Sequence, residues 1–471
     1  MFQKKNVTLG SNILQTGIWS IIGTFLIKAV NLISIPVFSR MLNTVEYGEI
    51  NLFMTYVTIF AVLLGMDFNG TLSKGSLEFS EQRYQYESSS LIFTAIFTSG
   101  ILLFFNMFSV PICKFAQMNT LEINLLLLYS YATFVISYFS ADCIFQFKYK
   151  KNTAISLIVA LSNFGLSALL IVTFFREERY YGRIIGAAVP TIIIAVIVLV
   201  FMICRGKIGV KWKYVKYSLK LSIPLIPHHL SGIVLSQADK IMINSMIGKA
   251  ETGIYSLIFN VGWLMSVLVE ALNNVWMPWL FRKMQDNVKQ IRESSILYLG
   301  GFSIIALAII TISPELVKII APESYWSGIQ CVVWIVFATY VVFLYYFYVN
   351  IECFYKKTYL ISIGTVMAAV INILLNFWGL ERFGFGFASI STVISYTVLL
   401  IFHYISVRFI IGKKIVSDLA VMVFFIIMLV YSLITQKFLE NILIRLLTGS
   451  IFGISMIRFV ILQKRKSLIV E

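Results

Sequence analysis

Charged residues and proline are both scarce in this chain. Charged side chains occupy 13% of the 471 positions, and the chain contains only 8 prolines. A soluble globular domain carries about a quarter charged residues. Hydrophobic residues supply 59% of the chain, and the mean hydropathy is +0.86. This composition excludes a soluble protein and predicts a membrane protein with little room for a soluble domain.

Cysteine and histidine are also rare. The 5 cysteines lie far apart, without the paired spacing of a disulfide framework, and the 3 histidines are His228, His229 and His403. No segment matches the phosphate-binding loop G-x-x-x-x-G-K-[ST] of ATP-driven proteins. We therefore expect no metal site and no bound cofactor.

Long apolar runs, in contrast, fill most of the chain. About 20 apolar residues span the roughly 30 Å hydrocarbon core of a bilayer, and a window of that length finds about 14 candidate transmembrane helices. They lie near residues 13–39, 49–66, 90–112, 121–143, 153–175, 184–204, 222–247, 254–272, 295–313, 328–350, 358–379, 385–407, 417–436 and 441–461. The first run is too long for a signal peptide and lacks a cleavage site. We expect an all-α polytopic membrane protein that retains its first helix.

The positive charges indicate how the chain is oriented. Lys and Arg are held back on the cytoplasmic side during membrane insertion. Most of the 38 Lys and Arg lie in segments that face the cytoplasm when both termini do, among them 148–151, 205–220, 282–292 and 463–466. We therefore expect both termini in the cytoplasm of a multi-pass protein. The net charge of +16 is explained by orientation and by contact with anionic lipid headgroups, without nucleic acid.

A weak internal repeat divides the chain in two. The stretch 42–53 matches 247–258 at Glu46/Glu251, Gly48/Gly253 and Leu52/Leu257, and 186–191 matches 386–391 at nearly the same offset. Six helices in each half give the halves the same orientation, an arrangement in which two bundles rock around a central substrate site. We predict a six-helix lobe at 1–204, a basic cytoplasmic linker at 205–221, a second six-helix lobe at 222–407, and two further helices with a basic tail at 408–471.

The seventh candidate helix has a polar side that a lipid-facing helix does not need. On a helical projection its polar residues fall within about 160° of arc. They are His228, His229, Gly232, Ser236, Asp239, Lys240 and Asn244, and Pro224 and Pro227 interrupt the start of the helix, which predicts a kink or an unwound turn. The first helix has the same plan, with Asn12, Thr16, Ser20, Gly23, Thr24, Lys28, Asn31 and Ser34 on one side. Since charges inside a membrane usually face a pathway, we expect both helices to line one polar space.

Simpler interpretations remain open for these residues. Asp239 and Lys240 could pair with a neighbour and hold the bundle together, although their side chains point about 100° apart on the helix. His228 and His229 could be structural histidines near the membrane interface. Asp67, Asp142, Glu270 and Glu352 lie at span ends, where charged residues are more often interfacial than functional.

Several features of the chain are shared with a known family, namely the stretches 39–52, 223–243 and 248–257 and a layout of six, six and two helices. In these features the chain resembles the polysaccharide transport family of the multidrug/oligosaccharidyl-lipid/polysaccharide (MOP) exporter superfamily, and within it the Wzx-type flippases. The resemblance covers nearly the whole chain. It implies a central cavity, alternating access, and a cargo of undecaprenyl-pyrophosphate-linked oligosaccharide flipped across the bacterial cytoplasmic membrane for O-antigen, capsule or exopolysaccharide. A polysaccharide polymerase and a chain-length regulator are the partners that it implies, beside membrane lipids.

The resemblance also implies site residues. Cations on the first and seventh helices would receive the pyrophosphate, which gives Lys28 and Lys240. Asn12, Asn31, Ser236, Asn244 and Asn260 can hydrogen-bond sugar hydroxyls. Asp239, His228 and His229 are candidates for coupling to an H⁺ or Na⁺ gradient, and Pro224 and Pro227 for a hinge between two states.

Two other classes of function remain as alternatives. A polytopic polymerase or glycosyltransferase needs a sizeable outward loop with converging charged residues, and the outward loops here are short. A multidrug or small-molecule antiporter of the same superfamily would favour acidic residues in its cavity, where this chain has lysines. We therefore expect a transporter and not an enzyme.

Overall fold

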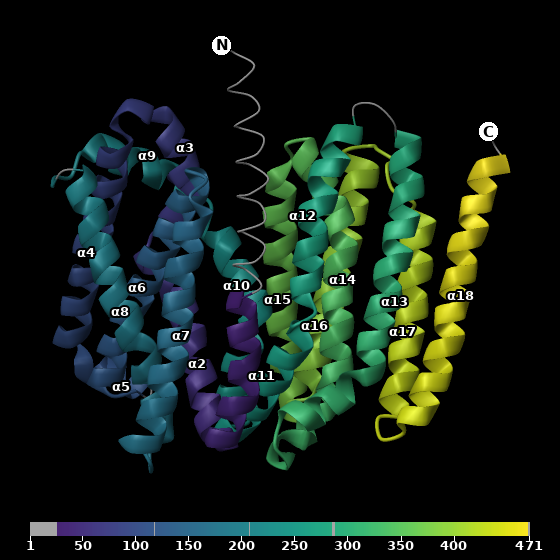
Figure 1. The fold of residues 1–471 in the computed structure, drawn as a ribbon, viewed down its shortest axis with the longest axis horizontal. Coiled ribbons are helices and arrows are strands. Elements are labelled where there is room, and N and C mark those ends of the chain that lie inside the picture. Colours follow the sequence, from purple (N-terminus) through teal and green to yellow (C-terminus); the bar gives the residue numbers. More distant parts are fainter. Residues whose placement is uncertain (1–25, 117, 207, 285–287, 470–471) are drawn as a thin grey trace. The chain divides into compact units, whose positions relative to one another are not determined.

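The protein is helical throughout the part of the chain that the computed structural model describes, which is 26–116, 118–206, 208–284 and 288–469 (Figure 1). These residues form no β-strand. Twelve helical segments among them are long and apolar enough to cross a membrane. The expected all-α polytopic fold is confirmed.

The chain forms two compact units, and unit 1 contains the described residues up to Leu42 and Glu49–Ile233. Residues 26–41 form its first described helix. The helices that follow are α2 (Thr44–Leu64), η1 (Phe68–Thr71), α3 (Leu72–Glu78), η2 (Ser80–Gln82), α4 (Arg83–Met107), α5 (Ser109–Ala116), α6 (Thr120–Phe145), α7 (Tyr149–Thr173), α8 (Arg179–Gly206) and α9 (Trp212–Ser222). The next helix, α10 (Ile226–Met246), starts in unit 1 and continues into unit 2.

Unit 2 contains Asn43–Gly48 and the described residues from Val234 onward. Its helices after α10 are α11 (Lys249–Trp263), α12 (Ser266–Lys283), α13 (Val288–Ile320), η3 (Glu323–Gly328), α14 (Ile329–Phe354), α15 (Thr358–Phe383), α16 (Phe387–Ile405), η4 (Ser406–Ile410), α17 (Asp418–Lys437) and α18 (Ile442–Ile469). The segment 408–471, expected as a separate addition, contributes α17 and α18, which pack against α13 at one edge of this unit (Figure 1).

Two of the expected spans differ from the others. Most of the first, 13–39, lies outside the described residues. The seventh corresponds to α10, which is helical but is not among the twelve apolar segments. Its polar residues, which include His228, His229, Asp239 and Lys240, lower its hydropathy.

The interruption predicted at Pro224 is present. Helix α9 ends at Ser222, residues 223–225 form a turn, and α10 begins at Ile226. Proline lacks a backbone donor and clashes with the preceding turn of a helix, which accounts for the break. The predicted linker at 205–221 is largely helical, since α9 covers most of it and packs on α3, η1 and α4 of unit 1.

Helix α14 lies at the centre of unit 2. Nearly every residue of α14 is buried, and the helix packs against α11, α12, α13, α16 and α17. The core of unit 1 is built differently, from apolar residues of η1, α3, α4, α6 and α8. The long apolar runs in the sequence therefore have two different roles. Some form helices that face lipid, whereas α14 is surrounded by protein on most sides.

The matched residues of the repeat have a structural role within unit 2. Glu46 caps the start of α2, because its carboxylate accepts a hydrogen bond from the Asn43 amide (2.9 Å) and its own amide donates to the Asn43 side chain (2.8 Å). Gly48 and Gly253 lie where α2 and α11 cross. A Cβ on either glycine would collide with a backbone carbonyl oxygen, that of Lys249 or that of Thr44. The matched glycines thus allow a close helix crossing, whereas the cap at Glu46 has no counterpart at the start of α11, where Gly248 provides no side-chain cap.

Candidate functional site

The residues predicted on the first helix are only partly described. Asn12, Thr16, Ser20, Gly23 and Thr24 lie outside the described residues. Lys28 is half-buried and Asn31 is exposed, and both belong to unit 1. The Ser34 hydroxyl donates to the Val30 carbonyl oxygen at 2.8 Å, within its own helix. The roles predicted for Lys28 and Asn31 remain predictions.

The two neighbouring histidines at the start of α10 differ in their surroundings. His229 Nδ1 lies 2.7 Å from a carboxylate oxygen of Asp67, a buried residue that follows α2. His228 has a buried Nδ1 that finds no hydrogen-bond partner among the described residues. The Asp67–His229 contact joins the end of α2 to the first turn of α10, shortly after the break at Pro224. It therefore anchors the segment that was predicted as a hinge.

Asp239 is the centre of a polar cluster inside unit 2. The carboxylate is 1% exposed and accepts hydrogen bonds from Tyr255 OH (2.7 Å), Thr392 Oγ1 (2.7 Å) and Asn376 Nδ2 (2.6 Å). The donors come from α11, α16 and α15. Ser391 and Asn372 extend the cluster through Asn376. A buried carboxylate is tolerated when several donors satisfy it, and these do so from three helices.

Lys240 is also buried, at 4% exposed, but its ammonium group makes no hydrogen bond within the described residues. Its Nζ lies 5.2 Å from the centroid of the Phe259 ring, and in the described part of the chain it makes no ion pair within 4 Å. A ring face attracts an ammonium group but does not neutralise it. Lys240 therefore holds a positive charge in the interior of unit 2 that an anion would stabilise.

The other two predicted residues of α10, Ser236 and Asn244, are half-buried. Aromatic rings lead from Lys240 toward the other end of the unit. Phe259 stacks on Trp263 with a centroid distance of 5.2 Å, and ring contacts then connect Trp263, Tyr396, Tyr345 and His403 in turn. These residues lie on α11, α14 and α16, so the series runs through the inside of unit 2.

His403 forms a second buried ionisable pair. Its Nδ1 lies 3.0 Å from both carboxylate oxygens of Glu352, and both side chains are almost completely buried. Glu352, expected to be interfacial from its position at a span end, thus lies inside the packed unit. Ionisable groups within a membrane bundle are expensive to bury and are functional candidates by default.

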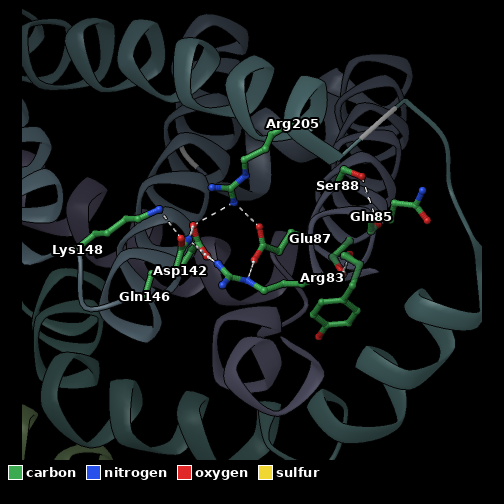
Figure 2. A network of polar contacts seen from close by, with 10 residues as sticks. Arg83, Gln85, Glu87, Ser88, Asp142, Gln146, Lys148 and Arg205 are labelled. Atoms are coloured by element: carbon green, nitrogen blue, oxygen red, sulfur yellow. Dashed lines mark hydrogen bonds and ion pairs between the residues drawn. The ribbon is translucent and has the colours of Figure 1, made fainter. Parts of the chain in front are cut away.

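Unit 1 holds a charged network at the ends of three helices (Figure 2). Arg83 and Glu87 of α4, Asp142 of α6 and Arg205 of α8 form four ion pairs, in which each arginine contacts both carboxylates. Gln146 donates to Asp142 at 2.7 Å and accepts from Lys148 at 2.5 Å. Both arginines also lie over the Tyr84 ring. The network is neutral, since two arginines balance two buried carboxylates, and it clamps α4, α6 and α8 together.

Sequence reasoning missed most of the partners of Asp239. Tyr255, Asn376 and Thr392 are separated from it by 16, 137 and 153 residues, so no local motif connects them. One signal was present, because Asn372 and Asn376 are four residues apart in an apolar run and therefore lie on one face of a helix. Two amides on one face of a membrane helix indicate a polar partner.

The cluster around Asp239 can bind a small cation or a proton. It combines one carboxylate with hydroxyl and amide oxygens, which are the ligands that hard cations such as Na⁺ prefer. The same carboxylate could instead take up a proton, since its three donors can adapt to the neutral form. Lys240, the next residue in the sequence, is suited to bind an anionic group.

Curated relatives cover most of the chain. An uncharacterized membrane protein of Haemophilus influenzae is 23% identical over 369 residues, which is 74% of this chain and 86% of that protein. Lsg locus putative protein 1 of the same organism is 21% identical over 380 residues, covering 75% of this chain and 88% of that protein.

Solved structures share the fold at low sequence identity. The inward closed conformation of the lipid II flippase MurJ superposes with a TM-score of 0.67 at 14% identity, covering 96% of this chain and all of that one. An inward-facing multidrug resistance MATE family transporter of the MOP superfamily gives 0.59 at 14% identity, covering 83% and 98%. The family model described as polysaccharide biosynthesis protein matches residues 13–284, more than half of the chain. The chain therefore belongs to the polysaccharide biosynthesis protein family.

Proposed function

We propose that this protein is a flippase that moves a polyprenyl-pyrophosphate-linked oligosaccharide, such as an undecaprenyl-linked O-antigen, capsule or exopolysaccharide unit, across the bacterial cytoplasmic membrane. Membership of a polysaccharide biosynthesis family and a fold shared with MOP transporters support this proposal. The protein works by alternating access, with both termini in the cytoplasm.

The buried charge of Lys240 is the observation that carries the proposal. A pyrophosphate crossing a low-dielectric region needs a counter-charge, and Lys240 provides a positive charge that no carboxylate neutralises by a direct ion pair in the described residues. Lys28 supplies the second cation. Asn31, Ser236 and Asn244 hydrogen-bond the sugar hydroxyls. A cationic drug, by contrast, would be repelled by these lysines.

The energy for directional transport comes from an ion gradient, of H⁺ or Na⁺, or from consumption of the product. Asp239 is the coupling residue, because it is a single carboxylate buried among neutral donors of three helices. Uptake of one cation changes the charge of the cluster next to Lys240 from negative to neutral. Binding of the ion and of the anionic cargo are thereby linked through adjacent residues of one helix.

Charge reversal tests the proposal. In a strain that lacks this protein, Lys28→Glu and Lys240→Glu should each abolish surface polysaccharide at a normal amount of protein in the membrane, because they repel the pyrophosphate. Lys28→Arg and Lys240→Arg should retain much of the export. Lys318→Glu, which makes the same charge change at an exposed position, is the matched control.

The amount of protein in the membrane separates the outcomes. A structural role for the lysines predicts loss of protein in step with loss of polysaccharide. Normal export by well-expressed Lys28→Glu and Lys240→Glu variants would overturn the assignment of these two residues. Efflux of cationic drugs with no effect on polysaccharide would favour an antiporter.

A further inference from the structure

Helix α9 has two opposite faces, and within the described part of the chain only one of them is buried against the protein. Tyr214, Val215, Ser218 and Ser222 are buried. Lys213, Lys216 and Lys220 are exposed and fall within about 60° of arc on the other side of the helix. Lys211, just before the helix, is exposed as well. The helix therefore presents three lysines on the side that faces away from unit 1, whereas the Lys211 ammonium group contacts Gln85 of α4.

Hydrogen bonds fix α9 to the first turns of α4. Gly209 O accepts from Ser89 Oγ at 3.2 Å, and Ser218 Oγ donates to Tyr86 OH at 2.9 Å. Lys211 Nζ donates to Gln85 Oε1 at 2.7 Å. The apolar part of α4 starts after these residues, at Leu91. Helix α9 thus lies level with the polar start of a membrane-spanning helix, where lipid headgroups are expected.

Three exposed apolar residues accompany the lysines. Ile208 is 84% exposed and Trp212 is 61% exposed, and Val210 is exposed too. The Trp212 ring contacts Phe93 of α4 edge-on, with a centroid distance of 6.1 Å. Phe93 lies within the apolar run of that spanning helix. A tryptophan in this position is typical of the boundary between headgroups and acyl chains.

The charge of this surface is not balanced by the chain around it. No Asp or Glu occurs between Arg179 and Ala238. Glu78 and Glu81 are exposed on the neighbouring α3 and η2, but within the described residues neither forms an ion pair with a lysine of α9. A row of lysines flanked by an exposed tryptophan is complementary to an anionic bilayer surface.

We propose that residues 208–220 form a binding surface for anionic phospholipid headgroups. Lys211, Lys213, Lys216 and Lys220 contact the phosphates, and Ile208, Val210 and Trp212 insert at the level of the glycerol backbone. Because α9 leads directly into the break at Pro224, lipid bound here holds the start of α10 at a fixed height in the membrane. None of these residues is among the lysines assigned to the cargo, Lys28 and Lys240.

Native mass spectrometry of the purified full-length protein tests the proposal. In detergent, the protein should retain dioleoyl phosphatidylglycerol in preference to dioleoyl phosphatidylcholine, and the preference should weaken as salt rises. Each lysine near an anionic surface contributes about fivefold to affinity, so K211Q/K213Q/K216Q/K220Q should lose phosphatidylglycerol affinity by about 600-fold. The quadruple Lys→Arg variant should bind like the parent.

A matched variant controls for net charge. K114Q/K249Q/K318Q/K437Q removes the same charge from exposed positions elsewhere and should leave phosphatidylglycerol binding unchanged. Equal losses in the two quadruple variants would overturn the proposal, because any surface charge would then suffice. Binding of inorganic pyrophosphate without binding of phosphatidylglycerol would also overturn it.

Photocrosslinking in cells provides a test that does not depend on the stability of the lysine variants. With p-benzoylphenylalanine in place of Trp212, irradiation should produce a phospholipid adduct, identified by its mass. An adduct with another protein as the sole product would assign this surface to a protein partner instead.

Discussion

Asp239 and Lys240 are adjacent in sequence but are stabilised in different ways. Hydrogen bonds from Tyr255, Asn376 and Thr392 compensate the buried carboxylate, whereas the ammonium group of Lys240 has an aromatic ring and no direct ion pair within the described residues. A charge deep in a membrane span costs roughly 2.5–3.5 kcal/mol on insertion scales. Retaining two such charges on one helix costs free energy. Binding of a cation by Asp239 and of an anion by Lys240 would explain why both charges are retained.

Replacing Asp239 by Asn should remove ion coupling while it preserves the shape of the cluster. We expect Asp239→Asn to lose polysaccharide export at normal membrane abundance. For a Na⁺-coupled protein, NaCl should raise the Tm of the parent above its value in choline chloride by a few degrees, since a ligand at ten times its Kd adds about 1.4 kcal/mol. The variant should show no such rise.

Glu323→Gln, at an exposed position, is the control for charge. If the variant loses export but NaCl does not raise the Tm of the parent, the coupling ion would be a proton. Export at the parental rate by Asp239→Asn would exclude Asp239 as the coupling residue.

Among the helices, α4, α6 and α8 are joined by the network of Arg83, Glu87, Asp142 and Arg205. Removing one partner of a buried ion pair leaves an uncompensated charge and typically costs about 3–5 kcal/mol. Asp142→Ala should therefore lower the Tm of the purified protein by roughly 5–10 °C. The double variant Asp142→Ala/Arg205→Met should be destabilised by less than the sum of the single variants, because it restores neutrality.

The comparison needs a pair of single variants and the double variant, each measured by intrinsic fluorescence during heating. Additive changes in Tm would show that Asp142 and Arg205 act independently, contrary to the geometry.

The turn between α9 and α10 gives a second prediction for the helices. Replacing both Pro224 and Pro227 by Ala should leave the protein inserted but slow its transport, because a continuous helix favours one arrangement of the hinge. Export should be followed as a rate after induction, at equal protein level. An unchanged rate would make the two prolines packing features only.

Hydropathy predicted the helices well, because a membrane-spanning helix needs one continuous apolar run and little else. The break at Pro224 was also predictable, because the effect of a proline on a helix depends only on its immediate sequence. The clusters around Asp239 and Asp142 were not, since their members come from helices far apart in the sequence. Asp142 and Glu352 were expected to be interfacial, and only the packing of α6 and α14 shows that both are buried.

For the molecule as a whole, the orientation in the membrane is the main untested prediction. Single cysteines at 40, 114, 180, 249 and 320 should react with an impermeant maleimide added outside intact cells. Cysteines within 210–216 should react only after the membrane is opened. Their labelling from outside alone would contradict the cytoplasmic placement of both termini and of residues 205–220.

The burial of α14 has a consequence for how the protein is made. Helices enter the membrane in chain order during synthesis, so α14 is inserted before α16 and α17, two of its packing partners, exist. The side chains that later pack on α16 and α17 must first face lipid, and the buried Glu352 near the end of α14 waits for its partner. His403, the partner of Glu352, arrives about 50 residues later, with α16. The newly made chain therefore passes through a stage in which part of α14, the later centre of unit 2, still faces lipid. At that stage the chain is most exposed to quality control.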